Sequence, residues 1–290
     1  MNNNSEKIIN YGLMVLLALI WGSSFILMKR GVEVFTYVEV AILRLVIACL
    51  VMIPFVWRKI ISTPKKLWVP LLVVAIFGNG IPAFLFTKAQ TVLDSSYIGI
   101  LNALVPLFTF VIAIFVFKTK WKIVNLIGIC IGLLGAVWLI AGNGVNFENS
   151  NYAWLIIIAT LCYAISLNTI KNYLQEMKSI DISGLAFMLV GPPCLIALCF
   201  TDFFETLSIA PKAWTALMYI SILAIFGTAI ALIIFNQLVK RTNAIFSSSV
   251  TYLIPIVAIA WGIFDGESIL NSHLIGVAII FTGIYLVNKK

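Results

Sequence analysis

Two prolines in this sequence each follow a polar residue by four positions within a long apolar stretch: Pro106 follows Asn102, and Pro255 follows Thr251. A proline inside a helix leaves the carbonyl group four residues earlier without its hydrogen-bond donor. Each site therefore places an amide or hydroxyl side chain beside a free backbone acceptor, and the chemistry on offer is hydrogen bonding. Because an unsatisfied acceptor is costly in lipid, we expect both sites to face protein, water or a bound solute.

The two proline sites belong to a longer repeat. The stretch from Gly78 to Phe117 aligns with the stretch from Gly227 to Gly266 at a constant offset of 149 residues. The aligned identities in this stretch include Gly78 with Gly227, Ile81 with Ile230, Phe86 with Phe235, and Pro106 with Pro255. Glycine and proline have strong effects on backbone shape, so these shared positions predict that the two halves of the chain have related folds.

The elements that position these residues are predicted to be membrane helices. With 62% apolar residues, 10% charged residues and a mean hydropathy of +1.10, the composition excludes an ordinary soluble domain. A helix needs about 20 mainly apolar residues to cross a bilayer. The predicted spans 1 to 10 are, in chain order, Ile8–Met28, Thr36–Trp57, Leu67–Thr87, Ser95–Phe117, Ile123–Ile140, Tyr152–Asn172, Ile182–Phe200, Ala213–Gln237, Ala244–Phe264 and His273–Val287.

Ten spans in two halves give five spans to each half, so the second half must enter the membrane from the opposite side. We therefore predict an all-α polytopic membrane protein with ten transmembrane helices, arranged as two inverted five-helix repeats over residues 1–145 and 150–290. Most of the 19 lysine and arginine residues fall in the loops on one side, together with both termini. By the positive-inside rule, that side is the cytoplasm.

Interrupted helices are the best indication of a binding site in such a chain. Span 3 contains Gly78, Asn79, Gly80 and Pro82 at its centre, a pattern typical of transporter sites, although a packing kink without ligand contact is the alternative. The polar and aromatic residues that we expect to line a cavity near the middle of the membrane are Trp21, Ser24, Asn79, Asn102, Tyr163, Asn168, Asn236 and Thr251. Helix breaks are expected at Pro82, Pro106 and Pro255. For Trp21, tight packing against neighbouring helices is the competing interpretation.

Three charged residues are further candidates. Glu39 lies within a turn of the outer end of span 2, from where its side chain can reach water. Arg44 lies about 12 Å into the same span at 1.5 Å per residue, and a charge at that depth needs a partner. We predict that Arg44 binds helix-end carbonyls or a carboxylate, with substrate contact as the alternative. Lys88 at the outer end of span 3 would favour an anionic solute, unless it is simply a solvated helix end.

Other function classes lack the residues that they need. No G-x-x-x-x-G-K-[ST] loop occurs, so we expect no ATPase activity. The five cysteines show no metal-type pairing with the single histidine, His273, so neither a metal nor another cofactor is expected, and no catalytic residues are assigned. The expected partners are a small-molecule substrate and the lipid bilayer, not nucleic acid, because topology accounts for the basic charge. Gly128, Gly132 and Gly135 form a small-residue face that packs either within the chain or against a second copy in a homodimer.

Several short motifs occur in order along the chain: the A-x-x-W-G-S-S-F run from Ala18 to Phe25, Leu43 with Arg44, Pro106, Pro255, and Gly266 to Ser268 followed by Gly276 and Gly283. With these motifs, the pattern as a whole resembles the EamA family of the drug/metabolite transporter superfamily. The resemblance implies a basket of ten helices, in which spans 1, 3, 4, 6, 8 and 9 enclose a central path that opens alternately to each side without ATP hydrolysis. One departure is Lys118, where the family often has a glutamate that the second half keeps as Glu267; this departure argues against a matched pair of proton carriers.

Together these observations predict a bacterial-type inner-membrane secondary transporter. We expect it to export small amino-acid-like metabolites or drugs, driven by proton coupling or solute exchange. A nucleotide-sugar or phosphate-ester exchanger is the alternative within transporters, but it would need several basic residues along the path. A non-transporting sensor or scaffold is the alternative outside them.

Overall fold

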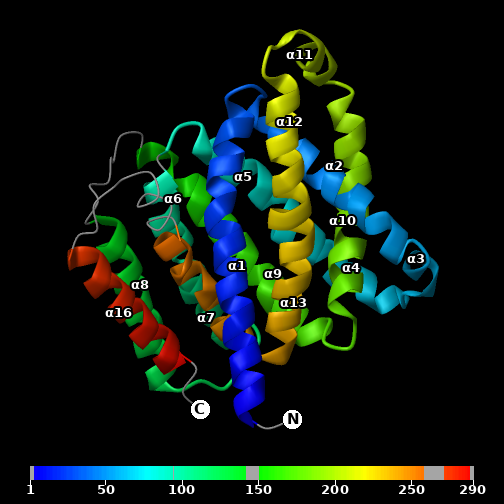
Figure 1. Ribbon diagram of the computed structural model, residues 1–290. Coiled ribbons are helices and arrows are strands. Elements are labelled where there is room, and N and C mark those ends of the chain that lie inside the picture. Colours follow the sequence, from blue (N-terminus) through cyan, green and yellow to red (C-terminus); the bar gives the residue numbers. More distant parts are fainter. Residues whose placement is uncertain (1–2, 94, 142–149, 258–270, 288–290) are drawn as a thin grey trace.

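The computed structural model of the protein describes residues 3–93, 95–141, 150–257 and 271–287, and within these ranges every regular element is a helix (Figure 1). The helices of the first part of the chain are α1 (Asn3–Val32), α2 (Tyr37–Val56), α3 (Lys59–Ser62), α4 (Trp68–Val73), α5 (Ile81–Gln90), α6 (Ser95–Asn102), α7 (Val105–Phe115) and α8 (Ile123–Ala141). The second part contains α9 (Ala153–Tyr173), α10 (Ser179–Leu198), α11 (Phe203–Ile209), α12 (Ala213–Ile222), α13 (Ala231–Arg241), α14 (Ala244–Ser248) and α16 (Asn271–Val287).

Six helices of the described chain are long and apolar enough to cross a membrane, by length and composition: Ser5–Val32, Tyr37–Val56, Lys65–Gln90, Ala153–Tyr173, Ser179–Leu198 and Ala213–Arg241. They coincide with predicted spans 1, 2, 3, 6, 7 and 8. Spans 4, 5, 9 and 10 contain the shorter apolar helices Val105–Phe115, Ile123–Trp138, Ala244–Val257 and Ile275–Val287. The chain is thus an all-α membrane protein, while the count of ten spans stays a prediction.

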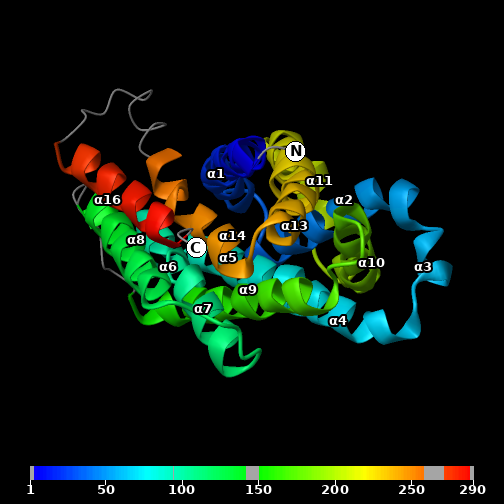
Figure 2. The same cartoon turned by 90° about the horizontal axis from the view of Figure 1, so that it is seen from below.

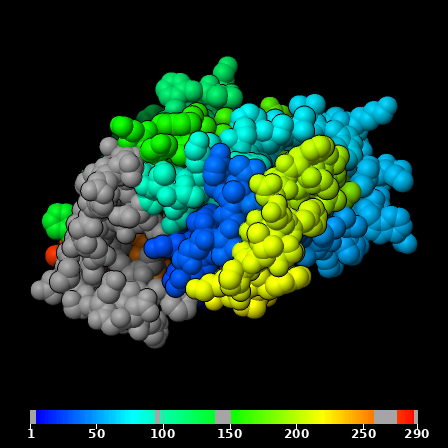
Figure 3. Space-filling model, turned by 90° about the horizontal axis from the view of Figure 1, so that it is seen from above, coloured from blue at the N-terminus to red at the C-terminus, as the bar shows by residue number. Residues whose placement is uncertain are grey.

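Helices from the two parts of the chain pack against each other in pairs. Helix α8 lies along α16, and α2 lies along α10 (Figures 1 and 2). In the same way, α1 lies against α12 and α13, and α9 lies against α4 and α5. Seen from above, the end of α1 lies beside α11, where Phe35 packs on Phe203 with ring centroids 5.5 Å apart (Figure 3). The bundle is therefore held together mainly across the two parts.

The predicted small-residue face is used within the chain. An added Cβ on Gly128 would come within 2.6 Å of the Val287 nitrogen, and one on Gly135 within 2.8 Å of the Ile280 nitrogen. These distances are shorter than a van der Waals contact, so the backbones of α8 and α16 can approach this closely only where both helices have small residues. The described neighbours of this face are α16 and, at Gly132, the ring of Tyr252, while a homodimer stays a prediction that would have to use another surface.

Two long helices are interrupted at equivalent positions by a π-helical turn. The first turn, Val74–Gly80, joins α4 to α5, and the second, Leu223–Ile230, joins α12 to α13. Their starts are 149 residues apart, the offset of the sequence repeat. The interruption expected at Pro82 is thus present, but the second copy has Ala231 at the equivalent position. Proline therefore does not account for the feature that the two copies share.

A shared polar contact accompanies the widened turn. Asn79 Nδ2 donates to the carbonyl of Val74 at 3.1 Å, and Thr228 Oγ1 donates to the carbonyl of Leu223 at 3.2 Å. Each donor lies five residues after its acceptor, which is the spacing of a π turn. In both copies the polar residue is preceded by the same four residues, Ala-Ile-Phe-Gly. This four-residue identity ends at Gly78 and Gly227, where the aligned stretches begin. It is the sequence pattern that marks both interruptions.

The other interruptions lie beside the two prolines of the repeat. Helix α6 ends at Asn102, and α7 begins at Val105 with Pro106 in its first turn, a position where proline fits a helix well. In the second copy, a 3₁₀ helix over Ser249–Tyr252 contains Thr251 and precedes Pro255. The closing motif Gly266–Ser268 lies outside the described residues.

Candidate functional site

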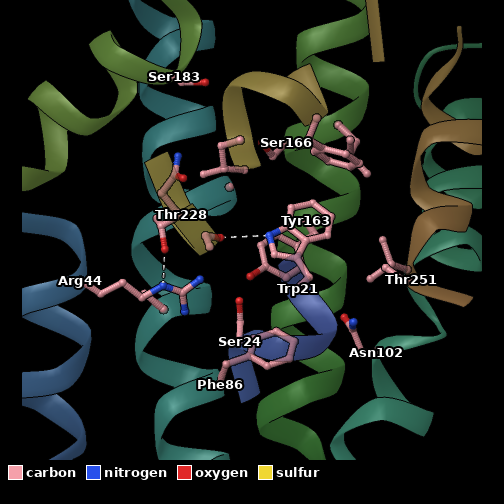
Figure 4. A pocket seen from close by; sticks show the side chains of 18 of the residues that line it. Trp21, Ser24, Arg44, Phe86, Asn102, Tyr163, Ser166, Ser183, Thr228 and Thr251 are labelled. Carbon is pink, nitrogen blue, oxygen red and sulfur yellow. Dashed lines mark hydrogen bonds between the residues drawn. The ribbon is translucent and has the colours of Figure 1, made fainter. Parts of the chain in front are cut away.

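A cavity lies at the centre of the bundle, where the interrupted helices meet (Figure 4). Its walls come from α1, α2, α5, α9, α10 and α13, from both π-helical turns, and from the broken segments that contain Asn102 and Thr251. The space that the centre of a water-sized sphere can reach is about 130 Å³. A single water needs roughly 10–15 Å³ on that measure, so the cavity has room for a small organic solute.

Seven of the eight residues predicted to line the cavity do lie on its wall: Trp21, Ser24, Asn79, Asn102, Tyr163, Asn236 and Thr251. The eighth, Asn168, is not among the lining residues. It is 1% exposed and donates from Nδ2 to the carbonyls of Thr109 at 3.1 Å and Ala164 at 2.9 Å. In this structure Asn168 therefore joins α9 to α7, and whether the other seven bind a solute stays a prediction.

Aromatic rings from the two halves meet in two pairs on the cavity wall. The Trp21 ring packs edge-on against Phe235 with centroids 5.0 Å apart, and the Tyr163 ring lies 5.7 Å from Phe86. Phe86 and Phe235 are equivalent in the repeat, and Trp21 and Tyr163 are related by an offset of 142 residues. Each aromatic pair thus joins one residue of the first half to one of the second half.

Two serines follow the same relation. Ser24 and Ser166 are also 142 residues apart, and both line the cavity. A Cβ on Gly78 would lie 2.4 Å from Ser166 Oγ, and a Cβ on Gly227 would lie 2.6 Å from Ser24 Oγ. The two glycines therefore allow α9 and α1 to approach the π-helical turns, and a side chain at either position would push a serine out of place.

Trp21 satisfies both interpretations that the sequence left open. It lines the cavity, and its indole Nε1 also donates to the carbonyl of Gly227 at 3.0 Å (Figure 4). An indole N–H inside a protein needs an acceptor, and this contact provides one at the second π-helical turn. The residue is thus a wall of the cavity and a link between α1 and the interrupted helix.

Arg44 lies on the cavity wall, and its contacts differ from those that we predicted. Its Nε donates to Thr228 Oγ1 at 2.7 Å (Figure 4). In the described parts of the chain it bonds neither a helix-end carbonyl nor a carboxylate, and the ion pairs there are Arg30 with Glu33 and Lys59 with Asp181. Among the described lining residues, Arg44 is the one charged side chain. The partners that we predicted for Arg44 are therefore wrong, and substrate contact stays a prediction.

The other two charged candidates lie away from the cavity. Glu39 is 1% exposed, so it does not reach water as predicted. Its carboxylate instead accepts from both the backbone nitrogen and the hydroxyl of Thr36 at 2.9 Å, while Thr36 Oγ1 accepts from the backbone nitrogen of Glu39. This reciprocal pair caps α2. The Lys88 ammonium lies 5.6 Å from the ring centroid of Tyr37, a cation–π contact.

The capping role of Glu39 can be tested by its effect on stability and transport. Thr36→Ala is expected to lower the free energy of unfolding by about 1 kcal/mol, because it removes the side-chain cap of α2. Glu39→Gln keeps an acceptor oxygen and should cost less, and it should leave transport unchanged because Glu39 does not line the cavity. Unfolding of the purified protein in detergent and an export assay measure the two effects. Loss of transport in a stable Glu39→Gln protein would show that the carboxylate does more than cap the helix.

Three polar, uncharged residues of the cavity wall were not among the eight that we predicted to line it. Ser166 and Thr228 are the repeat counterparts of the predicted Ser24 and Asn79, at offsets of 142 and 149 residues. Applying each offset to the predicted residues therefore identifies both. Ser183 on α10 accepts from Asn236 Nδ2 at 2.8 Å. No spacing in the sequence indicates that contact, because α10 and α13 are brought together only by the fold.

Two comparisons with known proteins bear on the whole chain. The model of the EamA-like transporter family matches residues 8–141 and again residues 150–289. A protein of known crystal structure superposes with a TM-score of 0.71 over 98% of this chain and 96% of that chain. At 17% sequence identity, this second likeness shows the fold alone.

Curated relatives match the chain over most of its length. The uncharacterized inner membrane transporter YedA of Escherichia coli K12 is 24% identical and is matched over 96% of this chain and 90% of its own. The uncharacterized transporter YoaV of Bacillus subtilis is 23% identical over 92% of each chain. Protein PagO of Salmonella typhimurium is 22% identical over 86% of this chain and 82% of its own.

Proposed function

Because this chain belongs to the EamA-like transporter family and is a multi-pass membrane protein, we propose that it is a secondary transporter that exports small amino-acid-like metabolites or drugs by alternating access. The resemblance noted in the sequence is confirmed by the family match. The observation that carries the proposal is the central cavity, whose described walls combine amides, hydroxyls and aromatic rings from both halves of the chain with the cation Arg44 from the first half. Such a mixture suits small solutes with polar and apolar parts.

We further propose that the two halves, residues 1–145 and 150–290, form inverted five-helix repeats that move relative to each other. The crossed packing supports this arrangement, because α1 packs on α12 and α13 just as α9 packs on α4 and α5. The paired π-helical turns lie beside the cavity in equivalent positions and could absorb a change in helix direction. Proton coupling or solute exchange would supply the energy.

The proposed orientation places both termini in the cytoplasm of a bacterial inner membrane. Helix α16 ends at the end of the bundle where α1 begins (Figure 1). Basic side chains gather at this end: Lys171 donates to the Thr242 carbonyl at 2.6 Å, and Arg241 donates from Nε to Asn10 Oδ1 at 3.0 Å. An excess of lysine and arginine is typical of the cytoplasmic side.

A phosphate-ester exchanger fits the cavity less well. A phosphate group carries up to two negative charges and commonly takes several cationic or backbone donors. The described lining residues include one basic side chain, Arg44. The composition of the cavity therefore favours solutes with at most one anionic group.

Export can be tested by comparing culture media. Bacteria that express the unmodified chain should enrich metabolites in the medium, and an Asn102→Leu, Thr251→Leu double variant should lower that enrichment by at least about tenfold. Each change removes a polar group from the cavity wall, and loss of two hydrogen bonds of about 1 kcal/mol each gives an effect of this size. Untargeted mass spectrometry of the medium, at matched protein abundance, measures it.

The matched control changes two exposed threonines, Thr215→Leu and Thr282→Leu, which lie on the outer surface of α12 and α16. This control should export as the unmodified chain does. Equal export by all three proteins would place the path outside the cavity. If no metabolite were enriched with any of them, export of metabolites would be contradicted.

A further inference from the structure

We propose that Arg44 is the anion-binding residue of the cavity and that it binds the carboxylate of a small solute, while Asn79 and Asn102 accept hydrogen bonds from a donor group on the same solute. The inference rests on the proposed function, since it names the class of solute that the transport site would take. It takes up substrate contact, the alternative that the sequence left open for Arg44.

The first support is the unused hydrogen-bonding capacity of Arg44. A guanidinium group has five N–H donors in a planar fork, and only Nε is bonded to a protein group in the described chain, at 2.7 Å from Thr228 Oγ1. Figure 4 shows the terminal nitrogens of Arg44 directed into the cavity. A charge at membrane depth requires a partner or water. A carboxylate matches the two terminal nitrogens because it can accept from both of them at once.

The second support is that the described lining residues carry a cation on one side of the cavity only. The offset of 142 residues that relates Trp21 to Tyr163 also places Glu39 on Asp181 and Leu43 on Leu185. It places Arg44 on Ala186, which is fully buried and uncharged. The second half thus repeats the helices around the cavity, but it has no cation at the position equivalent to Arg44. An anionic group entering the cavity therefore has one preferred position, beside α2 and the second π-helical turn.

The third support comes from two buried acceptors without donors. Asn79 and Asn102 are 7% and 6% exposed, both line the cavity, and the Oδ1 atom of each lacks a hydrogen-bond partner. For Asn79 the amide orientation follows from its Nδ2, which donates to the Val74 carbonyl. Buried acceptors are normally paired, and a pair of orphans in one cavity indicates a ligand with donor groups.

The Asn102 acceptor and the cation are separated across the cavity. In Figure 4, Asn102 lies with Thr251 on the side away from Arg44. Asn79 is the repeat counterpart of Thr228, the residue that orients Arg44. A solute that satisfies both sides must carry a carboxylate at one point and an N–H or O–H group at another. This requirement describes amino acids and hydroxy acids, and it excludes simple amines and hydrocarbons as preferred ligands.

Binding to the purified full chain tests this inference directly. The probes are three matched series: alanine, leucine and phenylalanine, each with the acid that lacks the amino group and the amine that lacks the carboxylate. We expect at least one amino acid to bind at least tenfold more tightly than its amine, measured by the concentration dependence of the thermal unfolding temperature. Arg44→Gln should weaken the carboxylate-bearing members about tenfold or more, and Arg44→Lys less, because lysine keeps the charge without the fork. Asn102→Leu should remove the preference for the amino acid over its acid.

Arg58→Gln is the matched control, since Arg58 lies outside the cavity over the Trp57 ring and its replacement changes the net charge equally. It should bind the probes as the unmodified chain does. The inference would be overturned if no carboxylate-bearing probe bound the unmodified chain better than its amine did. Undiminished binding to Arg44→Gln would also overturn it. Should Arg44→Gln fail to fold, the wild-type series and Arg44→Lys still decide the result.

The medium comparison separates this inference from the proposed function. Equal export of metabolites by the unmodified chain and by Arg44→Gln would leave transport standing and remove the role of Arg44. Carboxylate binding that depends on Arg44, without export of any metabolite, would keep the anion site and contradict the exporter.

Discussion

Replacing Gly283 with alanine is expected to lower the free energy of unfolding by about 1–3 kcal/mol, the usual cost of forcing an extra group into a packed interface. The new Cβ would lie 2.5 Å from the backbone nitrogen and 2.6 Å from the Cα atom of Gly132. A backbone atom cannot rotate away as the end of a side chain can. Helices α8 and α16 would have to move apart, and the contact that joins them would weaken along its length.

Gly12→Ala is the matched control for this prediction. Gly12 lies in α1, and a Cβ added there meets nothing within 4 Å. The same methyl group should therefore leave stability unchanged or raise it by up to about 1 kcal/mol, since alanine favours a helix more than glycine does. Unfolding of both variants in mixed detergent measures the difference. Equal stability of the two variants would mean that the close approach of α8 and α16 does not contribute to folding.

Replacing Trp21 with alanine is expected to reduce export of the identified metabolite by at least about tenfold. The change removes the ring that packs on Phe235 and the hydrogen bond to the Gly227 carbonyl. Trp21 is partly buried, so its loss costs at most the roughly 3–5 kcal/mol of a fully buried aromatic side chain, and about 1.4 kcal/mol of that at the cavity wall is enough for a tenfold effect. Trp21→Phe keeps a ring but lacks the indole N–H donor. Its export rate should therefore lie between those of the unmodified chain and Trp21→Ala, because it loses one hydrogen bond of about 1 kcal/mol. Export rate and the free energy of unfolding are measured together.

Trp214→Ala is the control, because Trp214 on α12 is 70% exposed and does not line the cavity. It should export at the rate of the unmodified chain. A normal rate for Trp21→Ala would show that the link between α1 and the second π-helical turn is not needed for transport. A loss of stability without a loss of export rate per folded molecule would assign Trp21 to packing alone.

Composition and local pattern predicted much of this protein. Apolar windows indicate membrane helices because each helix must satisfy its own backbone in lipid, so the signal lies within each segment. The positions of Asn102 and Thr251 beside the broken helices followed from the prolines for the same reason, since a proline acts on the turn that contains it. Polar residues in apolar helices need protein, water or ligand around them, and seven of eight such candidates lie on the cavity wall.

The predictions that failed concern contacts between distant segments. Arg44 was expected to bind a carbonyl or a carboxylate, yet its partner is Thr228, 184 residues away. Asn168 has the same polar character as the cavity residues, but it bonds Thr109 on α7 instead. Glu39 was close enough to Thr36 for a local explanation, since threonine followed three residues later by glutamate is a helix-start pattern.

The sequence by itself determined the membrane character, the repeat and the residues that interrupt its helices, because these depend on interactions along one helix or on comparison of one half with the other. Only the tertiary structure decided which interrupted helices enclose a cavity, which of the described polar groups remain unpaired in it, and that the guanidinium of Arg44 points inward. Those properties depend on which helix faces which, and here the faces are matched across the two halves by glycines at close contacts. In such a bundle, the partner of a side chain is set by packing between helices that are far apart in the sequence. No local sequence pattern describes that packing.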